Sequence, residues 1–126
     1  RYNNPVLNKV IDTLGELNDH RDTLSKGVAK LQEGSDKARG DAIKSVAALK
    51  AIDSRLNTID NGIETRNNLL LTKTDVGDIT KLQGELTALR EEKKDRIKDK
   101  TDTTAKMKEQ TDMMVKLNKY IRYKKP

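Results

Sequence analysis

The 126-residue sequence has no cysteine, tryptophan or phenylalanine, and it has only three tyrosines and two prolines. Without cysteine the chain can form no disulfide and offers no thiolate to zinc. The scarcity of aromatic residues removes the side chains that make the largest single burials in a compact core. Apolar residues make up 33% of the chain and charged residues 37%, against roughly 45–50% and about 25% in ordinary globular domains. This composition argues against a thick α/β or β-sandwich enzyme and favours long helices that meet along narrow apolar seams.

Motifs of catalytic chemistry are missing as well. No phosphate-binding glycine loop, dinucleotide fingerprint or nucleophile elbow occurs, and His20 is the only histidine. Four carboxylates follow one face of a predicted helix: Glu91, Asp95, Asp99 and Asp102. Lysines and arginines surround them, which favours a solvated face of ion pairs over a cation site. We therefore expect no enzyme, no cofactor, no metal site and no small-molecule substrate.

The distribution of proline favours long helices. Pro5 and Pro126 lie at the two ends, and proline disrupts helix interiors. Asn4 is the predicted N-cap of the first helix, with Pro5 in its first turn. Apolar residues then recur at alternating spacings of three and four, with Arg21 as the one exception: Leu7, Val10, Leu14, Leu17, Leu24, Val28 and Leu31. This spacing is typical of a helix that buries one stripe.

Breaking and capping residues predict that the first helix ends near Glu33. Gly34-Ser35-Asp36 and Gly40-Asp41 combine helix breakers with N-cap residues. A second helix follows, interrupted at Arg66, with an apolar stripe at Ala42, Val46, Leu49, Ile52, Leu56, Ile59, Ile63 and Leu70. Asn61-Gly62 is interpreted as a weak spot inside it. Residues 72–75 predict the next connection, with Thr74 or Asp75 as the following cap.

The third predicted helix opens on an apolar stripe that then thins. Its first apolar residues are Ile79, Leu82, Leu86 and Leu89, and the stripe resumes at Met113, Met114, Leu117 and Ile121. Between residues 91 and 112 only Ile97, Ala105 and Met107 are apolar. The polar stretch 98–104 has low helix propensity and good capping chemistry. A turn at 98–104, which would make four helices, is therefore the alternative to one unbroken third helix.

We predict an all-α fold in which residues 1–126 form one elongated antiparallel coiled-coil bundle. Its three long helices span about 5–33, 41–71 and 75–123, because short connections make successive helices antiparallel neighbours. A first turn near residue 37 would place Arg21 level with Asp53. Five polar positions in the seams are interpreted as fixing the register or leaving room for a partner: Arg21, Arg66, Lys93, Thr104 and Thr111.

The same geometry predicts an overhang at the C-terminal end. Around the second turn the numbers of facing residues add to about 147, so the third helix runs out of partner near residue 106, and about 20 residues, roughly 30 Å, project beyond it. Positive charge concentrates there. Residues 113–126 hold five basic residues and no acid, whereas residues 1–112 hold 21 basic and 20 acidic residues.

The predicted function is a non-enzymatic structural or protein-interaction module of a larger assembly, which binds a protein partner or a second copy through the end of its third helix. The predicted contact residues are Met114, Lys116, Leu117, Lys119, Tyr120, Ile121, Arg122, Tyr123, Lys124 and Lys125. One alternative is nucleic acid, with the cations on phosphates and two tyrosines stacked on bases. A second alternative is an anionic membrane surface. The plainest interpretation is that the seam continues and the cations favour a helix C-terminus.

Overall fold

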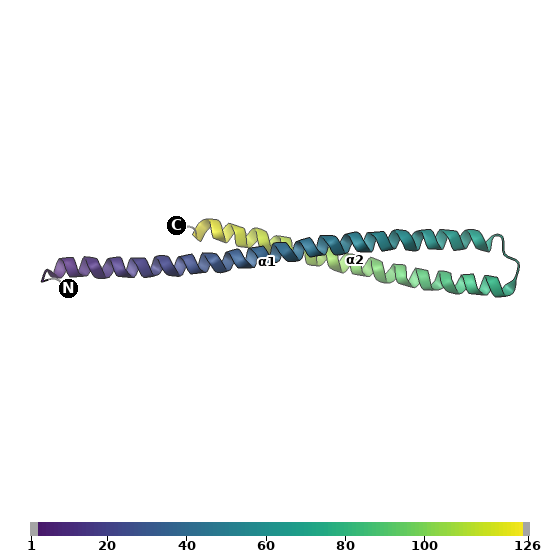
Figure 1. Cartoon of the computed structure of the whole chain (residues 1–126), viewed down its shortest axis with the longest axis horizontal. Coiled ribbons are helices and arrows are strands. Elements are labelled where there is room, and N and C mark those ends of the chain that lie inside the picture. The colour runs from purple at the N-terminus through teal and green to yellow at the C-terminus, as the bar shows by residue number, and fades with distance from the viewer. Residues whose placement is uncertain (1–2, 125–126) are drawn as a thin grey trace. The chain divides into compact units, whose positions relative to one another are not determined.

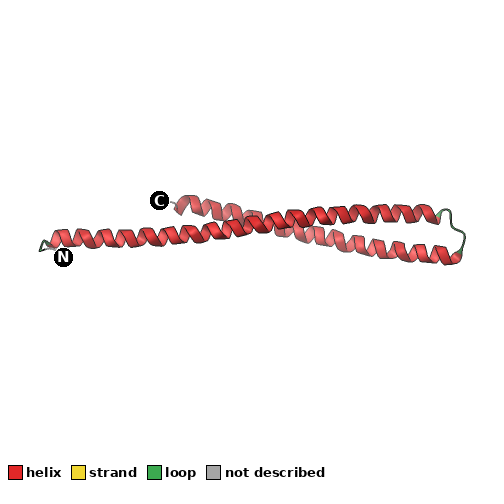
Figure 2. Ribbon diagram, in the orientation of Figure 1, coloured by secondary structure: helices red, strands yellow, loops and turns green. Residues whose placement is uncertain are grey.

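The computed structural model describes residues 3–124 and contains two α-helices (Figures 1 and 2). Helix α1 spans Pro5–Leu70 and helix α2 spans Val76–Lys124. The packing divides the chain into two units. Unit 1 consists of residues 1–40 with 110–126, and unit 2 of residues 41–109. The prediction of an all-helical chain is confirmed, but the prediction of a bundle of three or four helices is wrong.

The predicted turn at residues 34–41 does not exist, because α1 passes through it without a break. No glycine of the described residues has the positive φ that ends a helix. Ser35 and Ala38 are only 4% and 5% exposed. A Cβ on Gly34 would lie 3.2 Å from Cδ1 of Leu117. These small residues therefore serve as a packing face for α2, and this contact offsets the cost of about 1 kcal/mol for a glycine inside a helix.

One consequence of the predicted turn at residues 34–41 fails with it. Arg21 and Asp53 do not face each other across a hairpin, since they belong to one continuous helix. Asp53 instead pairs with Lys100 of α2, with 2.7 Å between the carboxylate oxygen and Nζ. Helix α2 is unbroken through residues 98–104, which confirms the prediction of one continuous helix there and contradicts the alternative of a turn. The hydroxyls of Thr101 and Thr104 donate to carbonyls four residues earlier, at 3.1 and 2.7 Å, so their polar groups are used within the helix.

The helix ends follow the local chemistry of the sequence. The side-chain oxygen of Asn4 accepts the N–H groups of Val6 and Leu7 at 3.0 and 3.3 Å, which confirms the predicted N-cap. Asp75 accepts the N–H of Gly77 at 3.0 Å and is the cap of α2. Thr72 closes the end of α1, because its N–H and its hydroxyl both donate to the carbonyl of Leu69. The connection predicted at 72–75 is thus where the chain turns.

Unit 2 is an antiparallel helical hairpin with a narrow apolar core. Ile59 is fully buried, and Leu82 and Leu86 are 9% and 2% exposed. Ion pairs flank this seam: Arg55–Glu92, Asp60–Lys93 and Asp53–Lys100, at 2.6, 2.8 and 2.7 Å. The last two pairs are seven residues apart on both helices, as expected of heptad packing. Ion pairs thus hold the register where the apolar stripe of α2 thins.

The polar seam positions differ in their surroundings. Arg66 is half-buried, forms an ion pair with Glu85 at 2.9 Å, and donates to the carbonyl of Gly62 at 3.1 Å. A Cβ on Gly62 would lie 3.3 Å from Leu89, so this glycine lets the two helices approach closely while α1 stays helical. Lys93 is half-buried and paired with Asp60. Thr104, Thr111 and Arg21 are exposed.

Candidate functional site

The apolar face of the C-terminal segment is packed within unit 1. Leu117 lies against Gly34, and the side-chain oxygen of Asn118 accepts a hydrogen bond from the Ser35 hydroxyl at 2.7 Å. Ile121 is 6% exposed, and Met114 is half-buried. The predicted overhang at residues 107–126 is therefore wrong. Because α1 continues where a turn was predicted, the end of α2 has a helix to lie against.

The other residues predicted at this end lie at the surface. Lys116, Lys119 and Arg122 are exposed, and Tyr120 and Tyr123 are 47% and 77% exposed. Lys119, Arg122 and Tyr123 together line a shallow depression of about 340 Å³. Lys125 and the side chain of Lys124 lie outside the described residues. The structure thus brings Lys119, Arg122 and Tyr123 to one surface, whereas Leu117 and Ile121 pack within unit 1.

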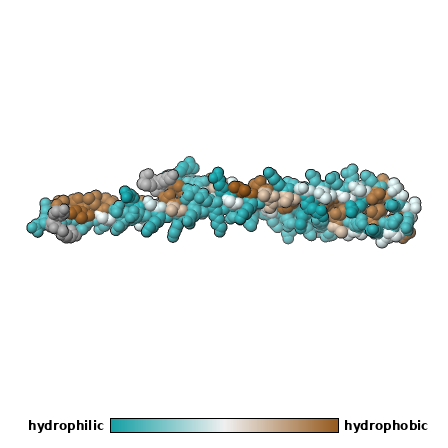
Figure 3. Space-filling view, viewed as in Figure 1, coloured by the Kyte–Doolittle hydropathy of each residue, from teal (hydrophilic) through white to brown (hydrophobic). Residues whose placement is uncertain are grey.

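The uncovered apolar face lies instead on the N-terminal part of α1. We call it the N-terminal seam; its members, which are 41–72% exposed, are Val6, Leu7, Val10, Ile11, Leu14, Leu17 and Leu24. In Figure 3 brown side chains gather over these first turns of α1. From residue 9 to residue 27 no residue of α1 is buried or half-buried. Within the part of the chain that the structure describes, nothing covers this face.

The antiparallel register explains where the cover ends. From the contact of Ser35 with Asn118, equal rise along both helices brings Lys124 level with about residue 29 of α1. Helix α2 ends there, whereas α1 begins at Pro5. In Figure 1 the purple start of α1 extends past the yellow end of α2. The projecting segment is therefore the start of α1 and not the end of α2.

The N-terminal seam continues the same helical face that α2 covers further along. Its spacing of three and four runs on through Val28 and Leu31 to the buried Ser35 and Ala38. Residues three and four apart share one face of a helix. Sequence reasoning missed this surface because it ended the first helix at residue 33 and paired it with the next. The signal was present, since the spacing keeps its phase across the supposed turn.

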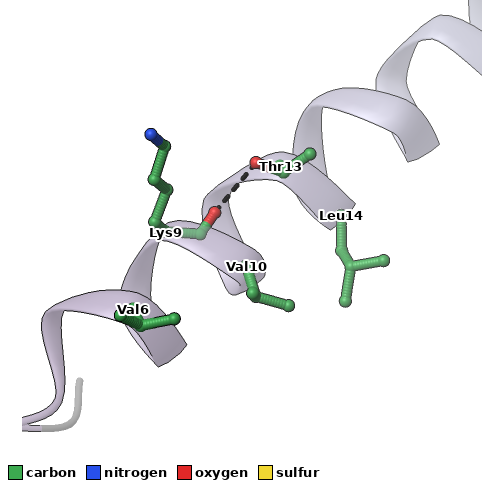
Figure 4. Close-up of a pocket in the computed structure, with 5 residues that line it drawn as sticks. All are labelled: Val6, Lys9, Val10, Thr13 and Leu14. Atoms are coloured by element: carbon green, nitrogen blue, oxygen red, sulfur yellow. Dashed lines mark hydrogen bonds between the residues drawn. The ribbon is translucent and has the colours of Figure 1, made fainter.

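Figure 4 shows the local geometry at the start of this seam. Val6, Val10 and Leu14 point to one side of α1, and the amine of Lys9 points to the other. The Thr13 hydroxyl donates to the carbonyl of Lys9 at 2.9 Å. Together these residues line a shallow and mainly apolar depression of about 320 Å³. Such a surface fits apolar side chains of a neighbouring helix better than a polar ligand.

Neither a cluster of metal ligands nor a membrane-spanning helix is found among the described residues. Among them no group of three or more histidine, cysteine or carboxylate side chains could hold a metal ion. No helix that the structure describes is long and apolar enough to cross a membrane. His20 is exposed on α1. In unit 2, hydrogen bonding to Arg55 lowers the pKa of the Glu92 carboxyl below its ordinary value.

Known proteins offer no further guide. Comparison of the chain with models of protein families, with curated proteins and with solved structures found no match in any of the three. The N-terminal seam is therefore the feature of the molecule from which a function can be argued.

Proposed function

We propose that this chain is a non-enzymatic coiled-coil interaction module whose N-terminal seam binds a helix of a partner. The observation that carries the proposal is the exposure of seven apolar side chains on one helical face, in phase with the face that α2 covers. We therefore assign the contact site to the start of α1 and not to the C-terminal end, where the sequence analysis predicted it. Within unit 1 the end of α2 covers α1 only from about residue 29 onward, so the segment before it is available.

The energetics favour a helical partner. A single helix is marginally stable in water and gains most of its stability from packing of an apolar face. Complete burial of a valine, leucine or isoleucine contributes roughly 1.5–3 kcal/mol relative to exposure. Leu14 and Leu17 are 60% and 58% exposed, so a partner helix that covers them would recover much of this free energy. It would also order the start of α1.

The proposal can be tested with a synthetic helical peptide that has leucine at its seam positions and uncharged flanks. We expect a fluorescently labelled peptide to show a rise in anisotropy with the full chain and to lose it with Leu14→Asp. The matched control is Ile43→Asp, because Ile43 is 64% exposed and lies in unit 2, outside the N-terminal seam. Equal binding by the two variants, or no binding by the unaltered chain, would overturn the proposal.

A second candidate is binding of single-stranded nucleic acid by the surface of α2 that holds Lys119, Arg122 and Tyr123. The observation that favours it is the exposure of these two cations and this tyrosine around one depression. Phosphate contacts make affinity fall steeply with salt, with a logarithmic slope of about −0.7 for each contact on a single strand. We expect Lys119→Gln with Arg122→Gln to weaken retention of single-stranded DNA and to flatten this slope. An unchanged slope would exclude this surface.

A membrane-bound arrangement of the same segment is not proposed. It requires the apolar side of α2 to enter the headgroup region. Ile121, on that side, is 6% exposed, and Leu117 lies against Gly34. These side chains are already used within unit 1.

A further inference from the structure

We propose that the partner of the N-terminal seam is the same segment of a second copy, bound in antiparallel orientation. This inference rests on the proposed function and adds the identity of the partner and its direction. It is carried by the charges beside the seam and by the position of Arg21 within it.

Charges flank the α1 seam at three positions of unit 2. Asp53 and Asp60 lie on one side of the α1 stripe and pair with lysines of α2, and Arg55 lies on the other side and pairs with Glu92. In a coiled coil these flanking positions select the partner by charge. The α1 and α2 stretches of unit 2 are thus complementary to each other and not to themselves.

The flanks of the N-terminal seam are different. At spacings of seven from Asp53, Asp60 and Arg55, the flanking positions hold no strong charge: they are Thr13, Asn18, His20, Ser25 and Gly27, with Ile11 of the N-terminal seam itself as the sixth. None of them is a lysine, an arginine or a carboxylate. At these flanking positions a partner with charged flanks has no opposite charge to pair with, and an identical segment brings no like charge. This pattern favours pairing with a second copy.

Arg21 decides the direction of pairing. It occupies a seam position, so a parallel dimer in register would place two guanidinium groups side by side, and like charges in contact are unfavourable. In an antiparallel dimer centred between Leu14 and Leu17, Leu14 of each copy packs against Leu17 of the other. This arrangement also places Leu7 against Leu24, and Arg21 against Val10, from where its long side chain can extend to water.

The antiparallel arrangement also matches the extent of the uncovered face. The pairing spans Leu7 to Leu24, about 26 Å of helix. Helix α2 covers the same face from about residue 29 onward. The segment of the second copy would therefore continue the cover from where α2 ends, and the seam of α1 would be paired over nearly its whole length.

The first test is the mass of the full chain in solution. We expect sedimentation equilibrium to show a concentration-dependent dimer, twice 14.2 kDa, and a monomer for Leu14→Asp that keeps most of the helical circular dichroism signal of the chain. Leu71→Asp introduces the same change in the connection, where Leu71 is 85% exposed, and should remain dimeric. A monomer at every concentration, or a dimer that survives Leu14→Asp, would overturn the inference.

The second test is direction, for which the absence of native cysteine is an advantage. We expect an equimolar mixture of Leu7→Cys and Leu24→Cys chains to give a disulfide-linked dimer on mild oxidation, and neither variant alone to do so. In the antiparallel pair, two Leu7→Cys sites are about 26 Å apart. Efficient linkage of either variant with itself would show parallel pairing and overturn the proposed direction.

Failure of this inference can be told apart from failure of the proposed function. If the chain is monomeric at every concentration but binds the synthetic peptide through Leu14, the proposed function is supported and the inference that a second copy is the partner is overturned. A chain that neither self-associates nor binds the peptide overturns both. The supporting result for the inference is self-association that a peptide copy of residues 5–27 competes away.

Discussion

The hydroxyl of Ser35 in α1 donates a hydrogen bond to the side-chain oxygen of Asn118 in α2, 2.7 Å away. Ser35 is 4% exposed, so this bond lies inside the packed face of unit 1. In an isolated peptide a serine next to glycine favours a helix end, because its hydroxyl competes for backbone groups. Here the second helix offers a partner for the hydroxyl, and the backbone remains helical.

Removal of this bond should cost measurable stability. We expect Ser35→Ala to lower the free energy of unfolding by about 0.5–1.5 kcal/mol, since Asn118 loses the donor of a part-buried hydrogen bond. Urea denaturation followed by circular dichroism measures the change. Ser54→Ala, at an exposed position of α1, is the control for the higher helix propensity of alanine. Equal effects of the two substitutions would contradict a role for the bond.

The glycines of the supposed turn should respond to alanine as helix-interior residues. Nothing lies within 4 Å of a Cβ at Gly40, so Gly40→Ala should raise stability by up to about 1 kcal/mol. Gly34→Ala should gain less, because its Cβ would lie 3.2 Å from Leu117. Thermal unfolding compares the two variants with the unaltered chain. A loss of stability in Gly40→Ala would show that α1 does not continue through this position.

The core of unit 2 should depend strongly on one isoleucine. Ile59 is fully buried, whereas Ile43, in the same unit, is 64% exposed. We expect Ile59→Ala to cost about 2–5 kcal/mol through lost burial and the cavity left behind. Ile43→Ala should stay within about 0.5 kcal/mol of the unaltered chain. Denaturant unfolding of both variants measures this difference, and similar losses would contradict the packing of the hairpin.

The ion pair Arg55–Glu92 should make stability depend on pH. Arg55 donates two hydrogen bonds to Glu92, at 2.6 and 2.7 Å, and thereby lowers the pKa of that carboxyl below its ordinary value. A lowered pKa in the folded state means that the contribution is present above the ordinary glutamate pKa and is lost as pH falls through the lowered value. We expect Glu92→Gln to destabilise the chain at neutral pH and to have little effect below the lowered pKa.

Unfolding free energies measured across the acid range test this expectation. Glu91→Gln removes a neighbouring exposed carboxylate from α2 and is the control for the loss of charge. A difference between Glu92→Gln and the unaltered chain that stays constant from neutral to acid pH would contradict the role of the pair. High salt should also reduce the difference, since both side chains are partly exposed.

Local chemistry determined the features that could be predicted from the sequence. Asn4 caps α1, because its side-chain oxygen satisfies N–H groups that have no helical partner. The connection at 72–75 was predictable, since the side chain of Asp75 accepts the N–H of Gly77, two residues further on, and so caps the next helix. The spacing of apolar residues likewise indicated helices with one buried stripe. None of these features needs knowledge of distant residues.

The number of helices and the position of the uncovered face depended on contacts between residues far apart in the chain. Gly34 and Ser35 have the local chemistry of a helix end, yet Leu117 and Asn118 of α2 make them part of a packed helical face. The sequence by itself determined that long helices form and on which face of each helix the apolar stripe lies. The tertiary structure alone decided that α1 is continuous, because packing against α2 outweighs the low propensity of a few residues. The exposed start of α1 follows from that continuity.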